Sequence, residues 1–97
     1  MEIQYLNEHQ EECLNILQEE CSEVIQAASK IKRFGLNNRK EITDLTNLES
    51  LELELGDVLA LIELCKVSGI GITDEGLERA KNNKFARIYQ WMNTTKE

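Results

Sequence analysis

Four carboxylates interrupt the apolar faces of two segments whose hydrophobic residues recur at the helical period. In the first segment, Glu20 falls in the middle of the apolar stripe and Glu23 lies at its edge. In the second segment, Glu54 and Asp57 occupy positions where a helix would otherwise bury leucine. A carboxylate on a buried helix face is tolerated only when something neutralises it. The fold must therefore bring these acids to a compensating group.

Each acid pair has the i,i+3 spacing that makes two side chains neighbours on a helix. The apolar stripe of the first segment comprises Leu6, Cys13, Leu17, Val24, Ala28 and Ile31. In the second segment, Leu48 to Ser68, apolar residues cover most of the circumference, which is typical of a buried helix. Both carboxylates of a pair can thus reach one centre, and we expect the two helices to form a metal site together.

The expected ligands are all oxygen atoms, because neither pair contains histidine or cysteine. Such a set suits Mg²⁺, or Mn²⁺ as the second choice, better than iron or zinc. His9 is far from the acids in sequence, and we expect it to be a partly exposed helix residue. The alternative interpretation is that the acids are ordinary helix-surface residues of an acid-rich chain.

Composition favours an all-α fold, since the 97 residues include 41% apolar residues, five aromatic residues and no proline. We predict a single domain, residues 1–97, folded as an antiparallel bundle of three main helices. A chain this short buries a limited core. Because the second helix is apolar on nearly every side, we expect a homodimer, or a dimer of dimers, to complete the bundle.

Charge and cysteine content limit the class of partner and the compartment. The net charge of −7 argues against nucleic acid, because binding phosphates needs a basic stripe. Three cysteines without C-x-x-C spacing suggest reduced packing residues. No signal peptide and no bilayer-length apolar run is evident, so we expect no membrane partner and a cytoplasmic location.

The three helices are delimited by polar and glycine-containing segments. The first is expected from Ile3 to Phe34, ending at Gly35, and the second from Leu48 to Ser68. Thr73 is the expected N-cap of the third. The polar connector between the first two, residues 36–47, is long for a helical bundle, and we expect it to act as a lid or to contact a ligand.

The third helix carries basic residues on or beside its apolar face. That face comprises Leu77, Ala80, Ile88 and Trp91. Lys84 lies within it, and Lys81 and Arg87 flank it. Lysine on such a face often only extends its stem over apolar neighbours while its ammonium reaches water. Three basic residues that face an acidic metal site would instead bind negative oxygens, with phosphate as the expected ligand. Weaker candidates for this role are Lys30, Lys32 and Arg33, because they close the first helix, where the helix dipole is sufficient to explain them.

These residues together resemble the all-α nucleoside triphosphate pyrophosphohydrolases typified by MazG. The family pattern is Glu-Glu-x-x-Glu, Glu-x-x-Asp and a basic Asn-x-Lys-Phe-x-Arg element on three successive helices. Here it reads Glu19-Glu20-Cys21-Ser22-Glu23, Glu54-Leu55-Gly56-Asp57 and Asn82-Asn83-Lys84-Phe85-Ala86-Arg87. The short chain and long connector are more similar to the small stand-alone members, including those of phages, than to two-domain MazG.

The resemblance implies a catalytic metal site and a triphosphate-binding site. Glu20, Glu23, Glu54 and Asp57 would hold magnesium. Lys84, with Asn82 or Arg87 and with Lys81 nearby, would contact the triphosphate. Magnesium would bridge the phosphates and orient a water for attack at the α-phosphorus, giving a nucleoside monophosphate and pyrophosphate.

Two further interpretations stay open at the level of sequence. A related enzyme could hydrolyse a specialised substrate such as dUTP, dCTP or phosphoribosyl-ATP. Alternatively, the chain is a non-catalytic helical dimerisation module whose acids pair with the basic residues of the third helix. The base of a nucleotide has several candidate contacts, namely Tyr5, Phe34, Trp91 and the connector asparagines.

Overall fold

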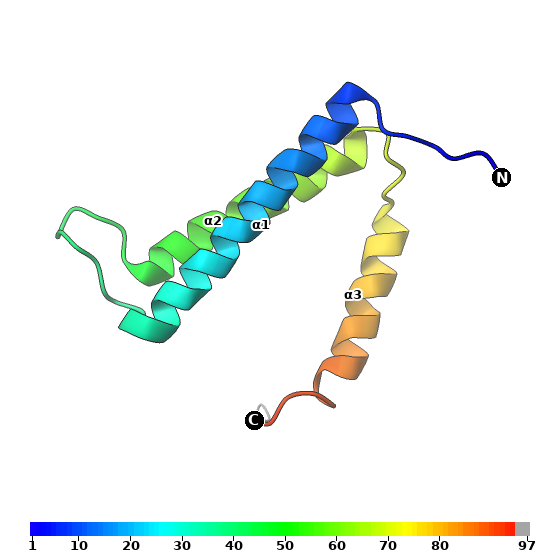
Figure 1. Cartoon of the computed structure of the whole chain (residues 1–97). Helices are drawn as coiled ribbons and strands as arrows, with labels where there is room; N and C mark the ends of the chain where they lie inside the picture. Colours follow the sequence, from blue (N-terminus) through cyan, green and yellow to red (C-terminus); the bar gives the residue numbers. More distant parts are fainter. Residues whose placement is uncertain (95–97) are drawn as a thin grey trace.

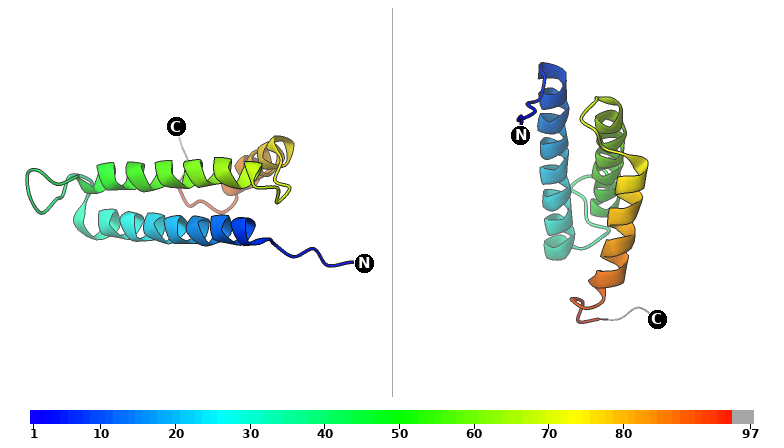
Figure 2. Two further views of the ribbon diagram at one scale, coloured as in Figure 1. Left: turned by 90° about the horizontal axis from the view of Figure 1, so that it is seen from above. Right: turned by 90° about the vertical axis from the view of Figure 1, so that its right-hand side faces the viewer.

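The protein is all-α, as predicted. The computed structural model describes residues 1–94 and contains three helices, α1 (Glu8–Phe34), α2 (Asn47–Val67) and α3 (Asp74–Ile88) (Figure 1). α1 and α2 run antiparallel and lie side by side, joined by the connector at one end of the pair (Figure 2). None of the described helices combines the length and apolar character needed to cross a bilayer.

Local capping sets the start of each helix. The Asn7 side chain accepts a hydrogen bond from the Gln10 amide at 2.8 Å, and the Gln10 side chain accepts one from the Asn7 amide at 3.0 Å. This capping box begins α1 at Glu8, so the prediction that the helix starts at Ile3 was wrong. Thr73 caps α3 as predicted, accepting a 2.9 Å bond from the amide of Gly76.

α1 and α2 pack along a seam in which successive α1 residues are spaced alternately three and four positions apart. The seam residues of α1, all partly or fully buried, are Gln10, Cys13, Leu17, Glu20, Val24, Ala27 and Ile31. Near its open end, Gln10 donates a 3.2 Å hydrogen bond from its side chain to the carbonyl of Ser68. Cys13 and Cys65 are each only 1% exposed. This alternation is the packing pattern of coiled coils.

α3 stands apart from the α1–α2 hairpin. No Cα atom of α3 lies within 8 Å of one in α1 or α2. The linker before it contains Gly69 and Gly71, both with positive φ, and Lys66 forms a 2.6 Å ion pair with Asp74 where α3 begins. Trp91 lies beyond the end of α3 and is 79% exposed, so the prediction that it extends the apolar face of the third helix was wrong.

The chain exposes far more surface than a compact protein of its size. Its accessible area is 8298 Å², whereas a compact monomer of this mass exposes roughly 5,700 Å². The radius of gyration is 17.1 Å, against about 12.5 Å for a compact domain of this length. α2 is not buried within one chain as its composition predicts. Its exposed leucines are Leu48, Leu53, Leu55, Leu59 and Leu64.

Candidate functional site

The predicted acid residues of α1 and α2 come together in the middle of the hairpin. One carboxylate oxygen from each of Glu20, Glu23 and Glu54 lies within 4.8 Å of the others. Asp57 lies next to this group, where its charge helps to raise the pKa of Glu20. The structure therefore brings three of the four acids that the sequence singled out to one centre, with Asp57 beside Glu20.

The antiparallel register explains why residues so distant in sequence meet. Gln10 pairs with Ser68 near the open end of the hairpin, and further along the seam Glu20 pairs with Asp57 and Glu23 with Glu54. The i,i+3 spacing in each helix then places two acids on each side of the seam. The cluster follows from helix spacing and register together.

Part of the cluster is shielded from water. Glu20, Glu54 and Asp57 are partly buried, and Glu23 is exposed. One buried carboxylate oxygen of Glu20 and one of Glu54 have no hydrogen-bond partner among the described residues. A buried oxygen that loses water without gaining a partner destabilises the fold. These two atoms are the sites at which a cation would supply the missing interaction.

Mutual repulsion and partial burial shift the pKa values of the two partly buried glutamates upward. The pKa of Glu54 rises to about 7, because its protonated carboxyl donates a hydrogen bond to Glu23, because it loses water, and because its acidic neighbours repel its charge. The pKa of Glu20 also rises, through desolvation first and then through the charges of Glu23 and Asp57. Glu20 and Glu54 thus resist carrying their negative charges without a cation.

A polar hollow of about 320 Å³ adjoins the cluster. Its walls are formed by Glu23, Gln26, Ala27, Lys30, Ser50 and Glu54. Lys30 is its one basic residue, located two helical turns after Glu23 on the same face of α1. The hollow therefore places an ammonium group on a surface shared with two of the carboxylates.

The basic residues predicted on the third helix are not brought to the acids within one chain. Lys81 instead forms a 2.9 Å ion pair with Glu78, and Arg87 donates a 3.2 Å hydrogen bond to the carbonyl of Asn83. Asn82 and Lys84 are exposed on α3, which contacts the hairpin through the Lys66–Asp74 ion pair at its start. Residues 1–94 show no ion pair between α3 and any of the four acids.

Sequence reasoning gave Lys30 only as a weaker candidate than the basic residues of the third helix. Its position at the end of α1 was explained by the helix dipole alone, a role that Lys32 and Arg33 fill equally well. The signal that identifies it is its spacing of seven from Glu23, because residues seven apart share a helix face. Ser50 was missed as a lining residue of this hollow. Its signal is its spacing of four from Glu54, which places the two side chains on one face of α2.

Comparison with protein families, with curated proteins and with solved structures finds no match to this chain in any of the three.

Proposed function

We propose that the protein is a magnesium-dependent nucleotide pyrophosphohydrolase that cleaves (deoxy)nucleoside triphosphates to the monophosphate and pyrophosphate. The observation that carries the proposal is the convergence of Glu20, Glu23 and Glu54 from two helices on one centre, with Asp57 beside Glu20. The order and spacing of these acids resemble those of the MazG-like enzymes. The all-α fold is consistent with that resemblance.

The donor set fits a hard divalent cation. It contains carboxylate oxygens only, which magnesium and manganese favour. Two of these oxygens are buried without a partner, and a bound cation would satisfy them. When bound, magnesium would neutralise phosphate charge and favour attack by water at the α-phosphorus. The protein itself would hold the phosphates in the hollow beside Glu23 and Glu54 and exclude part of the solvent there.

Ion pairing in place of metal binding is the competing explanation for the acids. It requires basic residues within about 4 Å of the carboxylates, and the described residues of one chain offer none. The interpretation as a non-catalytic module requires ion pairs that neutralise the acids. The described residues of one chain do not form them.

We also propose that the chain works as a homodimer or a dimer of dimers. The accessible area exceeds that of a compact monomer by about 2,600 Å² per chain, or about 5,200 Å² for two chains, which is at the upper end of the total area buried in obligate homodimers. The exposed leucines of α2 supply an apolar surface for such an interface. A second subunit would cover the helix that the sequence predicts to be buried.

Pyrophosphate release from a panel of ribo- and deoxyribonucleoside triphosphates, with magnesium and with excess chelator, tests the proposed activity. We expect magnesium-dependent release that Glu54→Gln abolishes. Glu52→Gln is the matched control, because Glu52 is exposed on the same helix and outside the cluster. Turnover that survives in Glu54→Gln would contradict the assignment, and release from one base alone would identify a specialised substrate.

A further inference from the structure

Positive charge gathers at the connector end of the hairpin, in a chain whose net charge is −7. Residues 30–40, here called the basic end, contain five of the eleven Lys and Arg residues and no Asp or Glu. The helix dipole accounts for cations in the last turn of α1. It does not account for Arg39 and Lys40, which lie in the connector beyond the helix.

The basic end contains a second hollow, here called the connector pocket, of about 560 Å³. Its lining includes Lys30, Phe34, Asn38, Arg39 and Lys40. Asp44 is the one acid in its wall, and the side chain of Asp44 already accepts a 3.0 Å hydrogen bond from the amide of Glu41. With three basic residues and one acid in its wall, the connector pocket carries a net positive charge.

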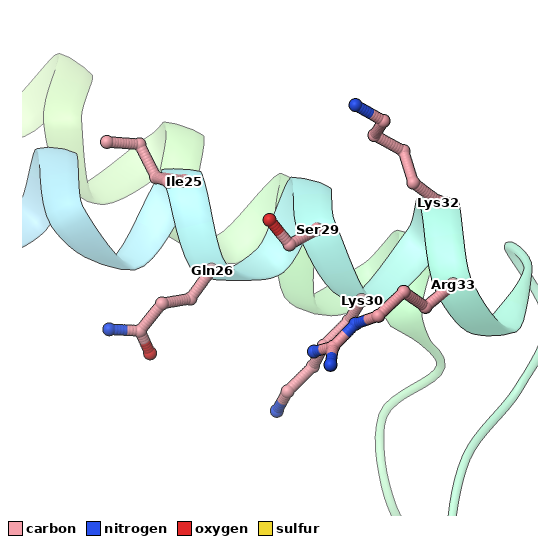
Figure 3. A pocket seen from close by; sticks show the side chains of 6 residues that line it. All are labelled: Ile25, Gln26, Ser29, Lys30, Lys32 and Arg33. Carbon is pink, nitrogen blue, oxygen red and sulfur yellow. The ribbon is translucent and has the colours of Figure 1, made fainter.

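Lys30 links the connector pocket to the acid cluster. It lines both the connector pocket and the hollow beside Glu23 and Glu54, and Ser50 also lines both. Lys30 and Arg33 extend to the same side of α1, whereas Lys32 extends to the opposite side (Figure 3). A ligand that reaches from the acids towards the connector would therefore pass Lys30.

The connector is fixed to the start of α2 by backbone contacts. The amides of Asn47 and Leu48 donate 3.0 Å hydrogen bonds to the carbonyls of Asn38 and Leu36. The amide of Glu49 donates to the side chain of Thr46. Since these amides of the α2 N-terminus are taken, an anion in the connector pocket must be bound by the basic side chains rather than by the helix end.

We propose that the connector pocket binds the phosphate chain of the ligand whose cation the acid cluster holds, with Lys30 in direct contact with phosphate. This inference rests on the proposed function for the identity of the ligand. It assigns to the connector end of the hairpin the phosphate contact that the sequence assigned to the third helix. A lysine between carboxylates and a basic pocket suits a polyphosphate with a divalent cation at one end.

Binding of inorganic tripolyphosphate in the presence of magnesium, measured by calorimetry, tests the inference apart from turnover. Lys30→Ala should weaken binding about tenfold or more, as expected for the loss of one charge-assisted hydrogen bond. Lys32→Ala is the matched control and should change the affinity less than about twofold, because Lys32 lines neither the connector pocket nor the hollow beside Glu23 and Glu54. Circular dichroism checks that both variants keep their helices.

The outcomes separate the inference from the proposed function. Tripolyphosphate binding that Lys30→Ala leaves unchanged would overturn the inference, even if the wild type hydrolyses nucleotides. Absence of tripolyphosphate binding by the wild type would overturn it as well. Lys30-dependent binding without any turnover would support the phosphate site and refute the pyrophosphohydrolase. The same variants are measured with a deoxynucleoside triphosphate, and a loss confined to that ligand would contradict the contact with phosphate.

Discussion

Magnesium binding should depend on pH through the protonation of Glu54. The pKa of this carboxyl is raised to about 7 by its hydrogen bond to Glu23, by desolvation and by its acidic neighbours. A proton on Glu54 competes with the cation for the same oxygen atoms. With a pKa of about 7, the ionised fraction falls from about 0.9 at pH 8 to about 0.1 at pH 6. The apparent affinity for magnesium should therefore fall about tenfold.

Without metal, the same group makes the protein less stable as pH rises. The folded-state pKa of Glu54 lies above its ordinary value, so folding favours the neutral form. That contribution is fully present below about pH 4.5 and is lost as pH rises through about 7. Magnesium should oppose this loss, because it replaces the proton as the neutralising charge. The stabilisation by magnesium should accordingly be larger at pH 8 than at pH 6 at equal concentration.

Thermal unfolding in a magnesium titration, at one protein concentration and at both pH values, measures the effect. Saturation at 100 times the Kd corresponds to about 2.7 kcal/mol, or a rise in Tm of about 10–20 °C for a domain of this size. Glu54→Gln should abolish both the response and its pH dependence, while Glu52→Gln should retain both. A magnesium affinity that is equal at pH 6 and pH 8 would refute the role assigned to Glu54.

Two further perturbations test the packing of the hairpin and its assembly. With an aromatic disulfide reagent, Cys21 should react rapidly and Cys13 and Cys65 slowly, because both are 1% exposed and burial raises the pKa of Cys65; rapid labelling of all three in the native protein would contradict this packing. Leu59→Glu should shift the protein from dimer to monomer in sedimentation velocity, because Leu59 is 65% exposed on the apolar surface of α2. Ile42→Glu, in the connector, should leave the dimer intact, and a monomeric wild type would refute the proposed assembly.

The helices and the acid cluster could be predicted because both depend on short-range spacing. The period of apolar residues identified all three helices, and Thr73 and Gly35 marked boundaries that the structure retains. The start of α1 was misplaced because the apolar residues before Asn7 continue the helical pattern. The signal in the sequence was Asn7 followed by Gln10 three positions later. Such a capping box determines where a helix starts more strongly than apolar periodicity does.

The position of α3 could not be predicted from spacing. Its direction depends on the linker backbone at Gly69 and Gly71, where no apolar pattern specifies a packing partner. Lys84 was therefore placed at the acids on sequence grounds, whereas within one chain Lys30 lines the hollow beside them. The two lysines look alike in sequence, and only the hairpin register distinguishes them.

The seam between α1 and α2 also limits how the two helices can slide along each other. If α2 shifted by one heptad, Glu54 would leave Glu23, Asp57 would leave Glu20, and the two pairs of acids would no longer meet. Polar residues at seam positions select one alignment of paired helices at a cost in stability. A cation bound by both pairs would stabilise only the register in which the two pairs meet. By binding one cation together, the carboxylates would then fix the register of the two helices before any substrate binds.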